Sequence, residues 1–94
     1  MIAESHVPTT TAAKYLKWLC GHFKIKVPAQ YDDHQGSIDF GFGHCQMQAD
    51  SEALHIRVEA DTTEALSRVK DVVGGHLERF AHKESVHVTW QDQA

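Results

Sequence analysis

The stretch LHIRVEADTTEALSRV, residues 54–69, decides the fold because its hydrophobic period changes part-way along. Residues 54–60 alternate between apolar and polar side chains, which is typical of a strand with one buried face and one solvated face. The apolar positions of this strand are Leu54, Ile56 and Val58. Residues 61–64, DTTE, then favour a helix start, with Asp61 as the N-cap and Glu64 at the third helical position, a variant of the capping box.

Apolar residues recur at helical spacing beyond this start and predict a helix that ends near residue 80. Its buried stripe contains Ala65, Leu66, Val69, Val73, His76, Leu77 and Phe80. Gly74 and Gly75 interrupt the stripe, and each costs roughly 1 kcal/mol relative to alanine inside a helix. Two adjacent glycines therefore indicate either close packing at this point or a local kink.

A second amphipathic helix is predicted near the start of the chain, with Thr10 or Thr11 as its N-cap. Its apolar stripe consists of Ala12, Leu16, Leu19, Cys20 and Phe23. Gly21 lies inside the stretch YLKWLCGHFKIK, residues 15–26, and is expected to end or loosen this helix. Whether the helix breaks there decides where His22 points.

Short segments of period two predict further strands within residues 3–7, 27–31, 38–40, 45–49 and 86–90. The order of elements is then β-α-β-β-β-β-α-β. Since both helices are amphipathic and the strands alternate, we expect an α+β fold, a two-layer sandwich in which a curved antiparallel sheet carries two helices on one face. Residues 1–94 are expected to form a single domain.

Composition narrows the functional classes. The net charge of −4, without a basic stripe, argues against a nucleic-acid partner. No apolar run approaches the ~20 residues of a membrane span, and the N-terminus lacks a signal peptide, so we expect a cytoplasmic protein that does not enter membranes. The two cysteines are then expected to be thiols.

Four segments resemble a known family. They are YLKWLCGHFKIKVP (15–28), GSIDFGFGHCQMQAD (36–50), LHIRVEA (54–60) and VVGGHLERFAHKESVHVTW (72–90). Together they resemble the small bacterial proteins of the domain of unknown function 2218 family. The resemblance implies a cytoplasmic α+β domain of this size and a link with iron or siderophore metabolism, without an established activity.

One candidate site combines two thiols and two imidazoles. Cys20, Cys45 and His76 are all expected on apolar faces that point into one layer, and His22 joins them only if the helix breaks at Gly21. Such a set would suit zinc or ferrous iron, although the spacing matches no established ligand signature. The alternative is that the cysteines pack in the core and that His76 bonds a backbone carbonyl or a neighbour such as Tyr31.

A second candidate is the flank formed by Tyr15, Trp18 and His22, which follow one another along the first helix. This flank could line a groove for an apolar or aromatic ligand such as a siderophore or a porphyrin. It could equally be the edge of the core or a dimer contact, where tryptophan and tyrosine are favoured.

A third candidate is the polar face of the sheet, which carries His55, Arg57 and His87. This face is either solvated or covered by a partner subunit. His55 and His87 would form a metal-binding pair if their strands were neighbours.

No GxSxG, P-loop or HExxH signature is present, so we do not expect an enzyme. The leading hypothesis is a small binding or accessory module with an unknown ligand, linked to iron or siderophore metabolism by its resemblance. The alternative is a non-catalytic interaction module that acts as a homodimer without a ligand, and a third hypothesis is a thiol-dependent enzyme.

Overall fold

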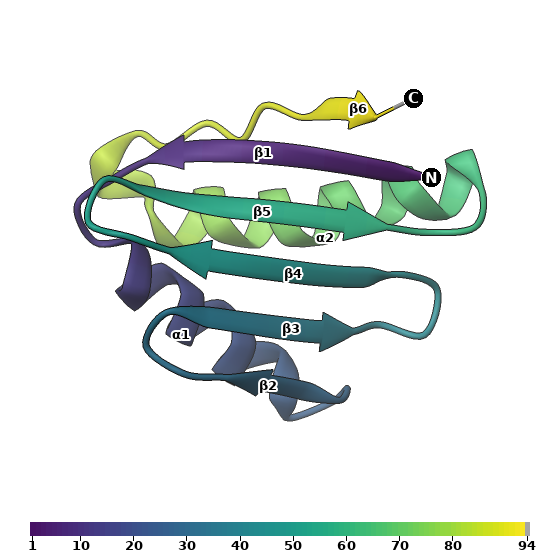
Figure 1. Ribbon diagram of the computed structural model, residues 1–94, viewed down its shortest axis with the longest axis horizontal. Coiled ribbons are helices and arrows are strands. Elements are labelled where there is room, and N and C mark those ends of the chain that lie inside the picture. Colours follow the sequence, from purple (N-terminus) through teal and green to yellow (C-terminus); the bar gives the residue numbers. More distant parts are fainter. Residues whose placement is uncertain (94) are drawn as a thin grey trace.

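The computed structural model describes residues 1–93, which form one antiparallel sheet and two long helices (Figure 1). The strands are β1 (Ile2–Pro8), β2 (Ala29–Tyr31), β3 (Gln35–Asp39), β4 (His44–Ala49), β5 (Ala53–Glu59) and β6 (Gln91–Gln93). The helices are α1 (Ala12–Lys24), α2 (Thr63–Phe80) and the short 3₁₀ helix η1 (His82–Glu84). The spatial order of the strands is β2-β3-β4-β5-β1-β6, so β1 lies between β5 and β6.

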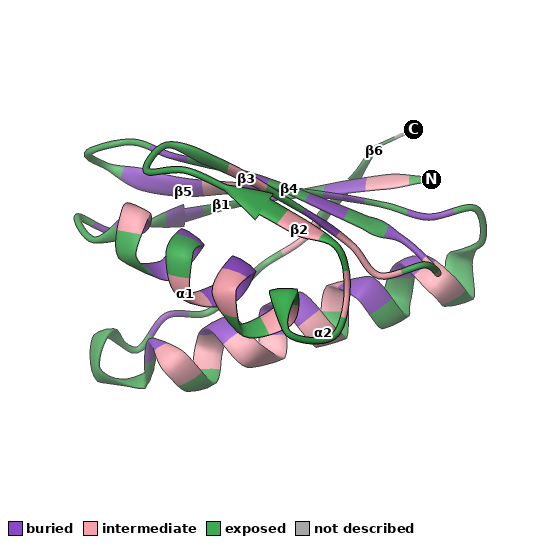
Figure 2. Cartoon of the chain, turned by 90° about the horizontal axis from the view of Figure 1, so that it is seen from below, coloured by how far each residue is buried: buried purple, intermediate pink, exposed green. Residues whose placement is uncertain are grey.

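Both long helices cover the same face of the sheet, and the opposite face carries no helix (Figure 2). This arrangement confirms the predicted α+β sandwich. The alternation of β4 shows how the sequence produces it, because Cys45, Met47 and Ala49 are buried under the helices while Gln46 and Gln48 are exposed on the other side. No helix within residues 1–93 is long and apolar enough to cross a membrane.

Helix α1 continues through Gly21 to Lys24, so the expectation that it ends or loosens at this glycine is wrong. The cost of one helical glycine is about 1 kcal/mol, which is smaller than the gain from burying apolar side chains on either side of it. Leu19 and Cys20 are fully buried, and Phe23 packs against the same core. Tertiary packing therefore holds the helix together across Gly21.

Helix α2 begins at a different N-cap from the one predicted, and at Gly74 it packs closely against the segment before β6. Its N-cap is Thr62 rather than Asp61, because the Thr62 hydroxyl accepts a hydrogen bond from the backbone N–H of Ala65 at 3.1 Å. The helix is continuous across the two glycines, from Thr63 to Phe80. Gly74 is buried and packs against Val88 and Trp90, where an added Cβ would make ordinary van der Waals contacts at 3.4–3.6 Å.

The last strand is Gln91–Gln93 rather than the predicted 86–90. Val86, Val88 and Trp90 do alternate towards the core, but the segment that contains them packs along α2. The backbone N–H of Val88 donates to Glu78 Oε2 at 2.8 Å and so does not join a strand ladder. The alternating burial of residues 86–90 therefore belongs to an extended segment that packs on α2 and bonds its Glu78 side chain, and not to a strand of the sheet.

Candidate functional site

The open face of the sheet is the surface without helices, and its residues are set by strand register. The register aligns one polar residue from each strand in a row that crosses the whole sheet. In spatial order this row, called the central row below, is Gln91, Glu4, Arg57, Gln46, Ser37 and Gln30. The row places one guanidinium among three amides, a carboxylate and a hydroxyl.

Glutamine is concentrated on this face. All the glutamines of the chain project from it, namely Gln30, Gln35, Gln46, Gln48, Gln91 and Gln93. No lysine of the chain lies on the strands that form it within residues 1–93. The open face is therefore rich in uncharged groups that both donate and accept hydrogen bonds.

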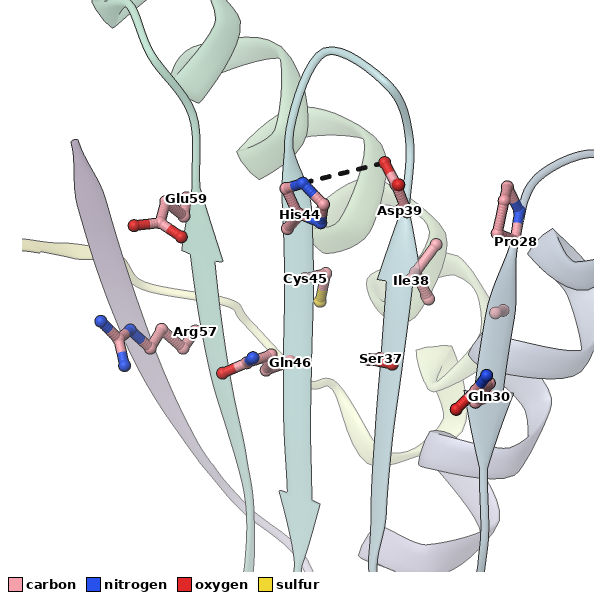
Figure 3. Close-up of a pocket in the computed structure, with 11 residues that line it drawn as sticks. Pro28, Gln30, Ser37, Ile38, Asp39, His44, Cys45, Gln46, Arg57 and Glu59 are labelled. Atoms are coloured by element: carbon pink, nitrogen blue, oxygen red, sulfur yellow. Dashed lines mark ion pairs between the residues drawn. The ribbon is translucent and has the colours of Figure 1, made fainter.

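Three adjoining depressions hollow the open face, and Gln46 lines all three. Their volumes are about 520, 520 and 430 Å³. Figure 3 shows the first of them, in which Arg57, Gln46 and Gln30 extend from separate strands. Within residues 1–93 the Arg57 guanidinium forms no ion pair, so its donors are free to meet a ligand.

A pair of histidines lies beside the central row. His6 on β1 is the cross-strand partner of His55 on β5, and their Nδ1 atoms are 3.2 Å apart. His87 precedes β6 in the extended segment, and β1 separates β5 from β6. The condition for a pair of His55 with His87, that their strands are neighbours, is therefore not met, and His55 lies beside His6 instead.

The predicted thiol and imidazole set does not meet as one group, but its members approach in pairs. The rings of His22 and His76 are 5.2 Å apart between centroids, and burial, followed by the charge of the nearby Cys20, raises the pKa of Cys45. Cys20 and Cys45 are fully buried, whereas His22 is exposed because α1 stays intact at Gly21. The ring of His76 donates from Nδ1 to the carbonyl oxygen of Val72 at 2.7 Å, which is the backbone alternative weighed above. Among residues 1–93, no three histidine, cysteine or acidic side chains converge to hold a metal ion.

The flank of α1 is covered by α2. The ring of Trp18 stacks on Phe80 at 4.1 Å between centroids, and Tyr15 meets Phe80 edge-on at 5.6 Å. His22 also stacks on Trp18, with 5.1 Å between the ring centroids. These rings form an aromatic seam between the two helices, which corresponds to the core-edge interpretation of this flank.

Comparison with known proteins identifies the family. The family model described as an uncharacterized protein conserved in bacteria, DUF2218, matches residues 4–91. The chain belongs to the DUF2218 family. A solved structure, the NMR structure of PA4090 from Pseudomonas aeruginosa, is 32% identical, has a TM-score of 0.81, and matches over 96% of this chain and 94% of that one. No curated protein matches the chain.

This DUF2218 protein also contains a polar cluster that the sequence did not reveal. The carboxylate of Glu84 accepts hydrogen bonds from the hydroxyls of Thr9 at 3.1 Å, Thr11 at 2.9 Å and Tyr15. The hydroxyl of Tyr15, followed by that of Thr11, holds the pKa of Glu84 below its usual range. The cluster fixes η1 to the start of α1, and its members are too far apart in the sequence for a motif to show them.

The thiols of this DUF2218 protein are unsuited to nucleophilic chemistry. Burial raises the pKa of Cys20 to about 11 and raises the pKa of Cys45 further still. Both groups are therefore protonated at neutral pH, and neither presents the accessible, low-pKa thiolate that a thiol-dependent enzyme requires.

We expect neither cysteine of the native protein to react with iodoacetamide at neutral pH, whereas both react after unfolding in guanidinium chloride. The measurement is the mass of the protein after fixed times of exposure. Ser37→Cys supplies a matched control, because it places a thiol on the open face, where it should be labelled readily. Native labelling of Cys20 or Cys45 as fast as this control would contradict the assignment and restore the thiol-enzyme hypothesis.

Proposed function

We propose that this DUF2218 protein is a cytoplasmic, non-catalytic binding module that holds a small, oxygen-rich molecule on the open face of its sheet. The observation that supports this function is the central row, in which Arg57 and Gln46 lie at the meeting point of the depressions. A depression of about 520 Å³ falls within the range of ~300–1,000 Å³ usual for small-molecule sites.

The chemistry of the face favours oxygen atoms on the ligand. Arg57 offers only donors, and each glutamine amide offers both donors and an acceptor. Carbonyl, hydroxamate and carboxylate oxygens are the groups that such donors recognise. A ligand with several such oxygens would engage Arg57, Gln46 and Gln30 together across neighbouring strands.

The acidic residues of the same face narrow the class of ligand further. Glu4 neighbours Arg57 in the central row, and Glu59 and Asp39 lie in the adjacent row on either side of His44. These carboxylates would repel a polyanion but not a neutral chelate. A neutral ferric trihydroxamate is such a molecule, and it also satisfies the link with iron or siderophore metabolism that the family resemblance implies.

We expect a gallium(III) trihydroxamate, a diamagnetic substitute for the ferric complex, to shift the side-chain NMR signals of Gln30, Gln46 and Arg57. Arg57→Gln should weaken binding by about tenfold or more, because it removes a charge-assisted donor. Arg79→Gln is the matched control, since Arg79 is exposed on α2 and remote from the open face. Its affinity should equal that of the unmodified protein.

Two results would contradict this proposal. One is the absence of any shift at millimolar chelate, and the other is an equal loss of affinity in both variants. NMR shifts confined to the aromatic seam would also contradict it, because they would indicate that the chelate binds at the flank of Tyr15, Trp18 and His22.

The alternative function is a homodimer that assembles through the same face without a ligand. One observation favours it, namely that the face contains arginine and lacks lysine, which is the composition usual at the centre of interfaces. A mass that rises to twice the monomer with concentration and falls back in Arg57→Glu, together with no chelate binding, would support the dimer over the binding module.

A further inference from the structure

The rings of His6 and His55 face each other on neighbouring strands of the open face. Their centroids are 4.7 Å apart at an interplanar angle of 62°, and the Nδ1 atoms approach to 3.2 Å. This close approach brings one nitrogen of each ring to a common point on the surface. Two nitrogens so placed either share a proton or share a metal ion.

Asp50 sets the tautomer of His55. Since a carboxylate only accepts, the Nε2–H of His55 donates to Asp50 Oδ2 at 3.1 Å, and in the neutral form of the ring Nδ1 carries a lone pair. The lone pair is directed at His6. A carboxylate that holds the distal N–H of an imidazole is the arrangement that commonly orients metal-binding histidines.

Asp50 is itself held firmly. Its Oδ1 accepts hydrogen bonds from the backbone N–H groups of Glu52 and Ala53, both at 2.8 Å. These two bonds hold the side chain in place and leave Oδ2 to accept from His55. The turn between β4 and β5 thus fixes His55 through a rigid acceptor.

The separation of the two Nδ1 atoms matches metal coordination. Zinc lies ~2.0–2.1 Å from an imidazole nitrogen, and two such bonds span 3.2 Å when the N–metal–N angle is roughly 100°. That angle lies between the tetrahedral and octahedral values, so both geometries are accessible after a small movement of either ring. The nitrogens do not have to be brought together by refolding.

We propose that His6 and His55 form a divalent transition-metal site on the open face, with Nδ1 of each ring as ligand and Asp50 as the carboxylate that orients His55. Imidazole nitrogens select zinc and copper over magnesium and calcium. No further histidine, cysteine or acidic side chain within residues 1–93 completes the set, so water fills the remaining positions. The depression around this pair is also lined by Gln46, Gln48 and Arg57.

This site does not depend on the trihydroxamate proposed above. It is tested with Zn²⁺ alone, so its failure would leave the ligand proposal standing, and failure of the ligand proposal would leave the metal site standing.

The test is calorimetric titration of Zn²⁺ into untagged protein that has been stripped of metal with a chelator. We expect one ion per chain. His6→Asn and His55→Asn should each weaken Zn²⁺ binding by about tenfold or more. Asp50→Asn should weaken it by at most ~100-fold, the upper end of the range for a residue that orients a metal ligand. The matched control is His87→Asn, an exposed histidine outside the pair, which should bind as the unmodified protein does.

A second measurement makes the result independent of how well the variants fold. In the unmodified protein, Zn²⁺ should shift the ¹⁵N resonances of Nδ1 in His6 and His55 and leave the imidazole of His87 unchanged. The proposal is overturned if no binding is detected at millimolar Zn²⁺. It is also overturned if the loss in His87→Asn equals that in His6→Asn, or if the shifted nitrogens belong to other histidines.

Discussion

Leu16→Ala is expected to lower the free energy of unfolding by about 2–5 kcal/mol, the range for a large-to-small change in a packed core. Leu16 is 0% exposed on α1 and lies against β3, where a Cβ on Gly36 would be 3.2 Å from Leu16 Cδ2. Truncation would remove apolar contacts and leave a cavity between the helix and the sheet. The backbone cannot close over it, because α1 is anchored on both sides by other buried residues.

The measurement is equilibrium unfolding in urea, followed by circular dichroism. Ile25→Ala is the matched control, because Ile25 follows the same helix and is 83% exposed. It removes a similar apolar side chain and should change the free energy of unfolding by no more than ~0.5 kcal/mol. Equal losses in the two variants would show that α1 does not pack on β3 as described.

Gly43→Ala is expected to destabilise the protein by about 1–3 kcal/mol through overpacking. Gly43 is buried in the turn before β4, and an added Cβ would clash with Val69 of α2 and lie 2.8 Å from the backbone oxygen of Glu59. A side-chain clash is relieved by rotation, but a backbone oxygen on a central strand cannot withdraw without disturbing the sheet. The close approach of turn, strand and helix at this point therefore requires glycine.

Gly75→Ala is the control for this substitution and should have the opposite effect. A Cβ on Gly75 meets nothing within 4 Å, and alanine is favoured over glycine in a helix by about 1 kcal/mol. Urea unfolding of both variants separates steric crowding from backbone entropy. Stabilisation by Gly43→Ala, or a loss on Gly75→Ala as large as that expected at Gly43, would refute the packing at these glycines.

The sequence predicted the layers of this fold because its periodicities are local. Alternation at Leu54, Ile56 and Val58 and the apolar stripe of α2 were sufficient for a strand and a helix. The errors occurred where tertiary contacts outweighed local preference. Tertiary packing keeps α1 helical through Gly21. In the alternating segment 86–90, the backbone N–H of Val88 donates to Glu78 of α2 and not to a neighbouring strand.

The candidate sites were harder to predict because they depend on which strands are neighbours. The polar positions of each strand could be read from alternation, and Arg57 and His55 were placed on the open face in this way. The insertion of β1 between β5 and β6 gives His55 its partner His6 and separates it from His87. Sequence periodicity contains no information about this order, so the central row and the histidine pair appeared only with the strand register.

The two outermost strands, β2 and β6, are each three residues long, and this brevity bears on aggregation. A sheet recruits further chains through unpaired backbone groups along a long, flat edge, which is how fibrils begin to grow. Here β6 pairs with only residues 2–4 of β1, and the segment before it runs alongside the rest of that strand (Figure 1). The fold therefore presents little edge to a growing fibril, and it keeps a wide polar face exposed without offering a template for uncontrolled strand addition.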